Sequence, residues 1–169
     1  MAQHQVYFSL GSNLGDRMEH LREGMKALSS KLKFVAASSV FETEPWGYAD
    51  DLPYLNIAAW FETDLNAHNL RKLCAEIEKA SGRFVKTNPK LSDYQSRTLD
   101  IDILFFDQQQ IEDFDLQIPH PRLHLRNFVL FPLAEINGGL WHPVLGKTIK
   151  ELLSSTADTS EIKRFARSI

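Results

Sequence analysis

The sequence predicts an α+β fold, in which helices cover one face of an antiparallel sheet. Four segments have the apolar pattern of strands, and two others repeat apolar residues at helical spacing. Their order is strand, helix, strand, strand, helix, strand, which is the ferredoxin-like arrangement. We expect the other face of the sheet to be left for a site or for extra C-terminal elements. In order, the six segments span residues 6–10, 16–30, 33–41, 54–62, 66–82 and 97–106.

Both helices of this core are predicted from the spacing of their apolar residues. Asn66 is a suitable N-cap for the second helix, and Gly82 suits its C-terminal end. The glycine-bounded turn at 11–15 lacks the Gly-Lys-Ser/Thr sequence of a phosphate-binding loop, so we expect a tight turn capped by a serine or an asparagine. The apolar faces comprise Met18, Leu21, Met25 and Leu28 in the first helix and Leu70, Leu73, Cys74 and Ile77 in the second.

The third strand and the C-terminal region follow from alternation and from turn residues. Alternation places Tyr54 and Asn56 on the same face of the third strand. Beyond the fourth strand we expect a turn at 108–110 into a short strand around Ile111, a rigid extended piece at 118–121, a short helix at 128–136 that Pro132 breaks, and a last helix at 147–154.

Length and composition are typical of a globular protein. The chain has 169 residues, from which we expect a single domain over 1–169. Its net charge of −3 argues against non-specific binding to nucleic acid, which needs a basic face. No apolar run approaches the length of a membrane span, and the N-terminus lacks the features of a secretion signal. With Cys74 as its one cysteine the chain can form no internal disulfide, so we expect a reducing, cytoplasmic location.

The most informative stretch is the strand at 97–106, because it carries two acids among apolar residues. Asp100 and Asp102 point to the same side, with carboxylates about 7 Å apart or closer. Unpaired they would repel each other, so we expect a cation between them, and such oxygen ligands suit Mg²⁺ together with substrate phosphates. Arg97 adds a positive charge near where those phosphates would lie. The alternative, an edge strand with solvated acids, is weakened by the apolar residues on both faces, which are Leu99, Ile101, Ile103 and Phe105 on one face and Leu104 and Phe106 on the face of the acids.

Other residues could bind ligands, but each also has an ordinary structural interpretation. A ring beside an amide, as at Tyr54 and Asn56, suits a flat heterocycle, although a core tyrosine with a loop-bonded asparagine is the simpler interpretation. Glu78 could bind a hydroxyl or an amine and Arg83 a phosphate, or both could belong to a solvated helix end. His120, fixed between two prolines, suits a positioned donor or a rim histidine bonded to a carbonyl, and the spacing of the six histidines does not favour a metal site.

Taken together, these motifs resemble those of the 6-hydroxymethyl-7,8-dihydropterin pyrophosphokinase family of folate biosynthesis. The Arg-Thr-Leu-Asp-Ile-Asp sequence at 97–102, with Pro-His-Pro downstream at 119–121, is highly specific. The other matches are weaker singly but fall in the family's order over nearly the whole chain. They are Leu-Gly-Ser-Asn-Leu-Gly at 10–15, Thr-Glu-Pro-Trp-Gly at 43–47, Tyr-Leu-Asn at 54–56, Ile-Glu at 77–78, Gly-Arg at 82–83 and Arg-Asn-Phe-Val at 126–129.

The resemblance implies transfer of a diphosphate from ATP to the hydroxymethyl group of the pterin, with release of AMP. It implies two Mg²⁺ ions on Asp100 and Asp102, and the catalytic group that it implies comprises these two acids with Arg83 and Arg97. The residues that it places near the nucleotide are Glu78, Arg83, Arg97, Ile103, His120 and Arg126. The pterin would lie between Tyr54 and Phe128, its edge bonded by Asn56 and by the loop of Thr43, Pro45 and Trp46. The segments 47–53 and 84–96 would close over the substrates.

The chain departs from the family pattern in the segment between Arg83 and Arg97. Many members carry Trp-Gly-Pro where this chain has Tyr-Gln-Ser at 94–96, and a further arginine for which Lys86 could substitute. These differences concern loop closure and the contacts to adenine rather than the metal site.

Two other functions fit parts of the sequence. A two-metal nucleotidyl or phosphodiester enzyme of the same fold could also use Asp100 and Asp102. A non-catalytic nucleic-acid-binding module of this shape would need aromatic residues among lysines and arginines on the sheet, and the net charge of −3 opposes it. We therefore expect small-molecule substrates, no nucleic-acid or membrane partner, a monomer, and no fused dihydropteroate synthase or aldolase domain.

Overall fold

The computed structural model of the chain describes residues 3–44, 52–82 and 98–169. Within these residues the central sheet has six strands in the order β10-β3-β4-β1-β5, with β2 also paired to β4. Every pairing in this sheet is antiparallel, as predicted. The strands are β1 (His4–Ser12), β2 (Lys33–Ala37), β3 (Val40–Thr43), β4 (Tyr54–Thr63), β5 (Asp100–Phe106) and β10 (Ile162–Ala166).

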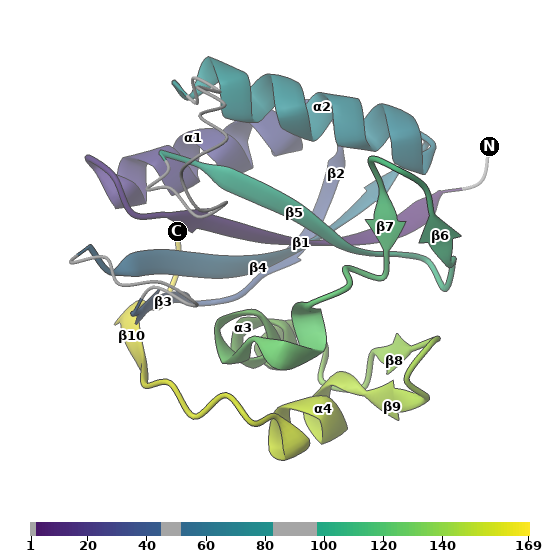
Figure 1. Ribbon diagram of the computed structural model, residues 1–169. Helices are drawn as coiled ribbons and strands as arrows, with labels where there is room; N and C mark the ends of the chain where they lie inside the picture. Colours follow the sequence, from purple (N-terminus) through teal and green to yellow (C-terminus); the bar gives the residue numbers. More distant parts are fainter. Residues whose placement is uncertain (1–2, 45–51, 83–97) are drawn as a thin grey trace.

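Two helices cover one face of the sheet and two lie on its other side (Figure 1). The first pair is α1 (Arg17–Ser29) and α2 (Ala67–Ala80), and the second pair is α3 (Asn127–Asn137) and α4 (Ile149–Ser155). Side chains alternate along each strand, so each face of the sheet packs into its own hydrophobic core. Phe8, Leu10 and Leu70 belong to the core under α1 and α2, and Tyr7, Phe105 and Leu130 to the core against α3. The ferredoxin-like arrangement with C-terminal elements on the second face is confirmed.

Short elements connect these layers. They are the paired strands β6 (Ile111–Glu112) and β7 (Gln117–Ile118), the 3₁₀ helix η1 (Leu123–Leu125), and the paired strands β8 (Trp141–His142) and β9 (Lys147–Thr148). The short strand expected around Ile111 is therefore confirmed.

Side chains cap the N-termini of both α1 and α2, and Asn66 caps α2 as predicted, but α1 is capped by Asp16 and not by the serine or asparagine expected in the turn at 11–15. Asp16 Oδ1 accepts from the backbone N–H of Glu19 at 3.0 Å, and Asn66 Oδ1 from that of Asn69 at 2.9 Å. Just beyond α2, Gly82 has a φ of +94°, a conformation that costs glycine little because it has no Cβ. These local signals fix where α1 and α2 begin and where α2 ends.

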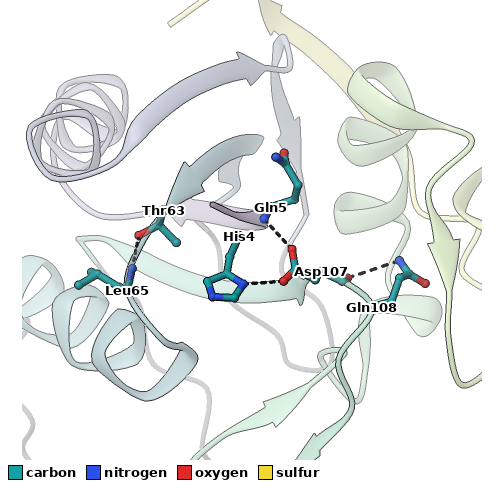
Figure 2. A network of polar contacts seen from close by, with 6 residues as sticks. All are labelled: His4, Gln5, Thr63, Leu65, Asp107 and Gln108. Carbon is teal, nitrogen blue, oxygen red and sulfur yellow. Dashed lines mark hydrogen bonds and ion pairs between the residues drawn. The ribbon is translucent and has the colours of Figure 1, made fainter. Parts of the chain in front are cut away.

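A polar network ties the start of β1 to the end of β5 (Figure 2). Asp107 Oδ1 accepts from the backbone N–H of Gln5 at 2.7 Å, and Asp107 Oδ2 lies 2.6 Å from Nδ1 of His4. Asp107 also has a φ of +50°, which turns the chain sharply after β5. These contacts help to hold the β1–β5 register, in which Gly11 pairs with Asp100.

The strand predicted at 33–41 is wrong, because the segment forms two strands. Ser38 lies between β2 and β3, where its hydroxyl accepts from the N–H of Ala58 at 2.9 Å and donates to the carbonyl of Ser39 at 2.8 Å. Side-chain hydrogen bonds of this kind compete with the strand ladder. The chain therefore resumes its pairing with β4 in a shifted register.

The helices of the C-terminal region differ from the prediction in two respects. Pro132 does not break α3, which continues through it. Proline removes one backbone hydrogen bond, but the buried side chains on either side of it, Leu130 and Leu133, keep both halves against the sheet. The last helix begins at Ile149 rather than at 147, because Thr148 caps its N-terminus.

The strand β10 has no counterpart among the elements that the sequence predicts. This strand pairs with β3, where Ile162 lies opposite Thr43. Its three central side chains are exposed, and two of them are the charged Lys163 and Arg164. The segment has no apolar face, so its sequence pattern does not indicate a strand that pairs through its backbone.

Candidate active site

Asp100 and Asp102 lie on β5 and are both partly buried. Ile101, between them, belongs to the core under α1 and α2, so the two acids share the opposite face of the sheet. β5 is an edge strand of the described sheet, as the alternative interpretation supposed. The acids are not freely solvated, however, since the side chain of Asp102 is only 34% exposed.

The alternation predicted along β5 fails beyond the acids. A register shift in the pairing with β1 leaves Leu104 as an extra residue. Phe105 therefore joins the core against α3 and Phe106 the core under α1 and α2, the reverse of the prediction. Asp100 and Asp102 precede the shift and keep their common face.

A cavity of about 410 Å³ opens beside the two acids, a size that suits a small-molecule ligand. Its lining includes Glu78 from α2, Asp100, Asp102 and Ile103 from β5, and His120 from the segment after β7. The fold thus brings together five of the residues predicted for the nucleotide or the metal, although they come from three separate segments.

Glu78 is buried, with an exposed fraction of 6%. Its Oε1 accepts from the backbone N–H of Ile101 at 2.7 Å. The solvated helix end considered for Glu78 is therefore wrong. The bond attaches the last turns of α2 to β5 at the residue between Asp100 and Asp102, so it holds the strand that carries both acids.

His120 places a ring nitrogen near these acids. Its Nδ1 accepts from the backbone N–H of Arg122 at 3.1 Å, and its Nε2 lies 3.9 Å from Oδ2 of Asp102. Burial lowers the pKa of His120 to about 4, with Arg126 acting in the same direction and Asp100 against it. At neutral pH the ring is therefore neutral, and because Nδ1 is an acceptor, its proton is on Nε2.

A second group of predicted residues lies where β3 pairs with β4. Thr43 pairs with Tyr54, and the Nδ2 of Asn56 donates to Thr43 Oγ1 at 2.7 Å. Thr43 and Asn56 are both buried, and Tyr54 is half-buried. The hydrogen bond fixes which way the amide of Asn56 is turned.

The two groups are joined by a row of three residues across adjacent strands. Gly11 of β1 pairs with Asn56 of β4 on one side and with Asp100 of β5 on the other. Paired residues share a face of the sheet, and strands are about 4.8 Å apart, so Asn56 and Asp100 stand about 10 Å apart on one face. A Cβ at Gly11 would lie 3.1 Å from Oδ1 of Asn56 and 3.6 Å from the ring of Tyr54. Glycine therefore keeps the floor between the two groups open.

Arg126 and Phe128 lie at the start of α3. The guanidinium of Arg126 is 5.7 Å from the centre of the Phe128 ring, and Arg126 is buried. This buried positive charge also acts on His120, whose pKa it lowers. The arginine thus belongs to the electrostatic surroundings of His120.

Several predicted residues lie outside the described part of the chain. They are Pro45 and Trp46, which were predicted for the pterin, Arg83 and Arg97, which were predicted for the nucleotide, and Lys86 and Tyr94. Within the described residues, no three His, Cys, Asp or Glu side chains are grouped as a metal site.

Sequence reasoning missed two residues of this region. Arg71 lines the cavity together with Glu78, and the two are seven residues apart on α2. That spacing places them on one side of the helix and was a usable signal. The role of Gly11 depends on strand register, for which the sequence alone offers no comparable signal.

Cys74, which the sequence places on the apolar face of the second helix, is a buried thiol. Burial raises its pKa to about 12, so it is protonated at neutral pH and is a poor nucleophile. Among the described helices, none is long and apolar enough to span a bilayer.

The chain is similar in sequence to one family of enzymes. A family model described as 7,8-dihydro-6-hydroxymethylpterin-pyrophosphokinase (HPPK) matches residues 7–138. A Bacillus subtilis (strain 168) protein named 2-amino-4-hydroxy-6-hydroxymethyldihydropteridine pyrophosphokinase is 41% identical over 133 residues, which cover 78% of this chain and 77% of that protein. A Methylorubrum extorquens protein of the same name is 36% identical over 162 residues, which cover 95% of this chain and 98% of that protein.

Solved structures share the fold. A crystallised HPPK-DHPS in complex with substrates superimposes with a TM-score of 0.70 at 14% identity, covering 92% of this chain and 43% of that chain. Wild-type Plasmodium falciparum HPPK-DHPS with pteroate gives a TM-score of 0.69 at 17% identity, covering 90% and 42% respectively. This chain therefore spans less than half of each of these longer proteins.

Proposed function

The chain belongs to the 7,8-dihydro-6-hydroxymethylpterin-pyrophosphokinase family, and from that premise we propose how its residues hold the two substrates. The enzyme transfers a diphosphate from ATP to the hydroxymethyl group of 6-hydroxymethyl-7,8-dihydropterin, a step of folate biosynthesis. Its products are AMP and the pterin diphosphate. The relatives do not favour the two-metal nucleotidyl or phosphodiester alternative.

The observation that supports the proposal most is the row of Asn56, Gly11 and Asp100. We place the pterin over Asn56 and Thr43, with its ring between Tyr54 and Phe128 and its edge also bonded by Pro45 and Trp46. A flat heterocycle needs such a combination of stacking and edge hydrogen bonds. The hydroxymethyl group would then point along the row toward Asp100, where the diphosphate of ATP must arrive. A separation of about 10 Å leaves room for one phosphate between the two groups.

We propose that Asp100 and Asp102 hold two Mg²⁺ ions. The donor set fits this metal, because Mg²⁺ in nucleotide sites takes one or two carboxylates and completes its shell with phosphate oxygens and water. Two partly buried carboxylates on one face of β5, beside a cavity, supply such a set. When bound, the metal neutralises phosphate charge and fixes the line of attack at the β-phosphorus.

The remaining residues bind and orient the nucleotide in this proposal. Neutral His120 offers its Nε2 proton to a phosphate oxygen, and Arg126 adds a fixed positive charge. Ile103 and Glu78 line the nucleotide cavity, where Glu78 also holds the backbone of β5 in place. Arg83 and Arg97 are proposed to neutralise the charge that develops on the phosphates during transfer. None of these roles needs a covalent intermediate on the protein.

The reaction is tested by identifying its nucleotide product. With ATP, Mg²⁺ and 6-hydroxymethyl-7,8-dihydropterin, we expect one AMP for each pterin diphosphate formed, as measured by anion-exchange chromatography. ADP or inorganic pyrophosphate as the main product would contradict diphosphate transfer. Omitting the pterin is the control, and it should abolish AMP formation.

We propose that residues 1–169 form one pterin pyrophosphokinase domain, that the protein is a monomer, and that it acts in the cytoplasm without nucleic-acid or membrane partners. Light scattering coupled to size-exclusion chromatography tests the monomer directly, since a dimer would double the mass of 19.4 kDa.

A further inference from the structure

Arg17, the first residue of α1, contacts three other segments of the chain. Its Nη1 donates to the carbonyl of Pro53 at 2.9 Å, and its Nη2 lies 2.8 Å from Oε2 of Glu42. Its guanidinium carbon also lies 5.7 Å from the centre of the Phe165 ring. The side chains of Arg17 and Glu42 are only 23% and 31% exposed, so this ion pair is better shielded than one on the open surface.

The partners of Arg17 lie next to residues proposed to bind the pterin. Glu42 precedes Thr43 at the end of β3, and Pro53 precedes Tyr54 at the start of β4. Thr43 and Tyr54 pair with each other across the two strands. One guanidinium therefore holds both strands at the point where they carry the pterin-side residues.

Arg17 contacts these strands on the face of the sheet opposite to that of Thr43 and Asn56. Side chains alternate along β3, so Glu42 and Thr43 point to opposite faces of the sheet. Arg17 bonds Glu42 on the face covered by α1, whereas Thr43 and Asn56 point to the face opposite. Any effect of Arg17 on the pterin must therefore pass through the strands.

We infer that Arg17 is a positioning residue for the pterin. This inference rests on the proposed placement of the pterin over Thr43, Tyr54 and Asn56. Arginine suits this role because its planar fork can bind a carboxylate and a carbonyl at once, whereas the single ammonium of lysine is a point charge. The ring of Phe165 lies against the same guanidinium, and β10, which carries it, pairs with β3. The C-terminal strand therefore supports the same contact.

The test compares Arg17→Met with Arg22→Met, a matched change on the same helix. Arg22 makes a looser pair with Glu19, at 3.7 Å, and both of these side chains are more than half exposed. For Arg17→Met we expect the KM for 6-hydroxymethyl-7,8-dihydropterin to rise about tenfold, because small displacements of binding groups weaken positioning strongly. The KM for ATP should change by less than about twofold, since the contacts of Arg17 are remote from β5. Arg22→Met should leave both constants unchanged.

Two further variants make the result decisive. Arg17→Lys should give a pterin KM between those of Arg17→Met and the wild type, because one ammonium cannot replace both contacts. Glu42→Gln is a milder change that stays informative if Arg17→Met fails to fold, and it should raise the pterin KM selectively. Equal changes in the two KM values, or a loss of thermal stability with both KM values unchanged, would overturn the inference.

Asn56→Ala separates this inference from the proposed site. If Asn56→Ala raises the pterin KM but Arg17→Met and Glu42→Gln do not, the role of Arg17 is wrong and the site stands. If Asn56→Ala leaves the pterin KM unchanged, the placement of the pterin is wrong, and the inference about Arg17 is overturned with it.

Discussion

At the scale of single residues, the carboxylates of Glu78, Asp100 and Asp102 have different roles because their surroundings differ. Glu78 is buried and accepts a backbone N–H from β5, so it serves the strand. Asp100 and Asp102 are only partly buried and line the cavity, so they can bind a ligand. His120, whose pKa burial lowers to about 4, adds a neutral N–H beside them rather than a competing cation.

The role of Asp102 is tested by replacing it with the isosteric Asn. Asp102→Asn keeps the shape of the side chain but removes the charge that would hold Mg²⁺. We expect Mg²⁺-dependent AMP formation to fall by more than about tenfold, equivalent to about 1.4 kcal/mol in the barrier. The circular dichroism spectrum should match that of the wild type.

A matched control for this variant is Asp113→Asn. The side chain of Asp113 is 52% exposed and pairs with His68 at 3.0 Å. The Asp113→Asn variant should have the same turnover as the wild type. Near-wild-type turnover in Asp102→Asn would contradict a metal role for that carboxylate.

At the scale of elements, the site depends on how β1 sits between β4 and β5. The β1–β4 and β1–β5 registers bring Asn56 and Asp100 to opposite sides of Gly11. The network of His4, Gln5 and Asp107 at the far end helps to hold the second of these registers (Figure 2). A slip by one residue would turn every side chain of a strand to the other face, so register and site are inseparable.

Gly11→Ala tests the row directly. The added methyl would lie 3.1 Å from Oδ1 of Asn56, close enough to displace the amide or to occupy the floor of the proposed pterin site. We expect the pterin KM to rise more than the ATP KM in steady-state assays. Gly139→Ala is the control, because its added methyl would come no closer than 3.8 Å to Asn137 Oδ1. An unaltered pterin KM in Gly11→Ala would mean that the pterin lies elsewhere.

The β8–β9 hairpin carries a pH-dependent contribution to stability. Nδ1 of the buried His142 accepts from the backbone N–H groups of Val144 at 3.3 Å and Leu145 at 3.1 Å. Burial lowers the pKa of His142 below its ordinary value of 6.5, and nearby His124 acts in the same direction. As the pH falls below 6.5, the unfolded chain therefore takes up the proton before the folded chain does.

We expect the free energy of unfolding to decrease as the pH falls from about 7 to about 5, by at most about 1.4 kcal/mol per pH unit from this residue. Urea unfolding of the wild type and of His142→Asn across this range measures the effect. The variant should show the shallower pH dependence, because groups such as His120 titrate in both proteins and cancel. Parallel profiles would exclude a contribution from His142.

At the scale of the whole molecule, the sequence predicted the order of the core elements because each had a strong local signal. The cap Asn66 and the apolar helix faces are examples, as are the paired acids on a mostly buried strand. The regions that were wrong or missed depend on tertiary contacts. Ser38 interrupts a strand through a bond to Ala58, and Pro132 is tolerated because the residues around it are buried.

The candidate site was predictable in its residue types but not in its geometry. The motifs named Asn56, Glu78, Asp100 and His120, yet no local pattern says that Gly11 separates two of them or that Glu78 bonds the backbone of β5. Those relations arise from register and from helix-to-strand packing. The resemblance to a family predicted the reaction, whereas the distances between the site residues come from the fold.

The central claim is that Asp100 and Asp102 hold the metal that brings ATP to a pterin seated over Asn56. A crystal structure with a non-hydrolysable ATP analogue, the pterin and Mn²⁺ in place of Mg²⁺ tests it most directly, because anomalous scattering locates the metal without ambiguity. We predict manganese bound to both carboxylates and to phosphate oxygens, with the pterin hydroxymethyl group facing the β-phosphorus along the row through Gly11. A fully bound nucleotide with no manganese on either carboxylate, or a pterin away from Asn56, would contradict the account.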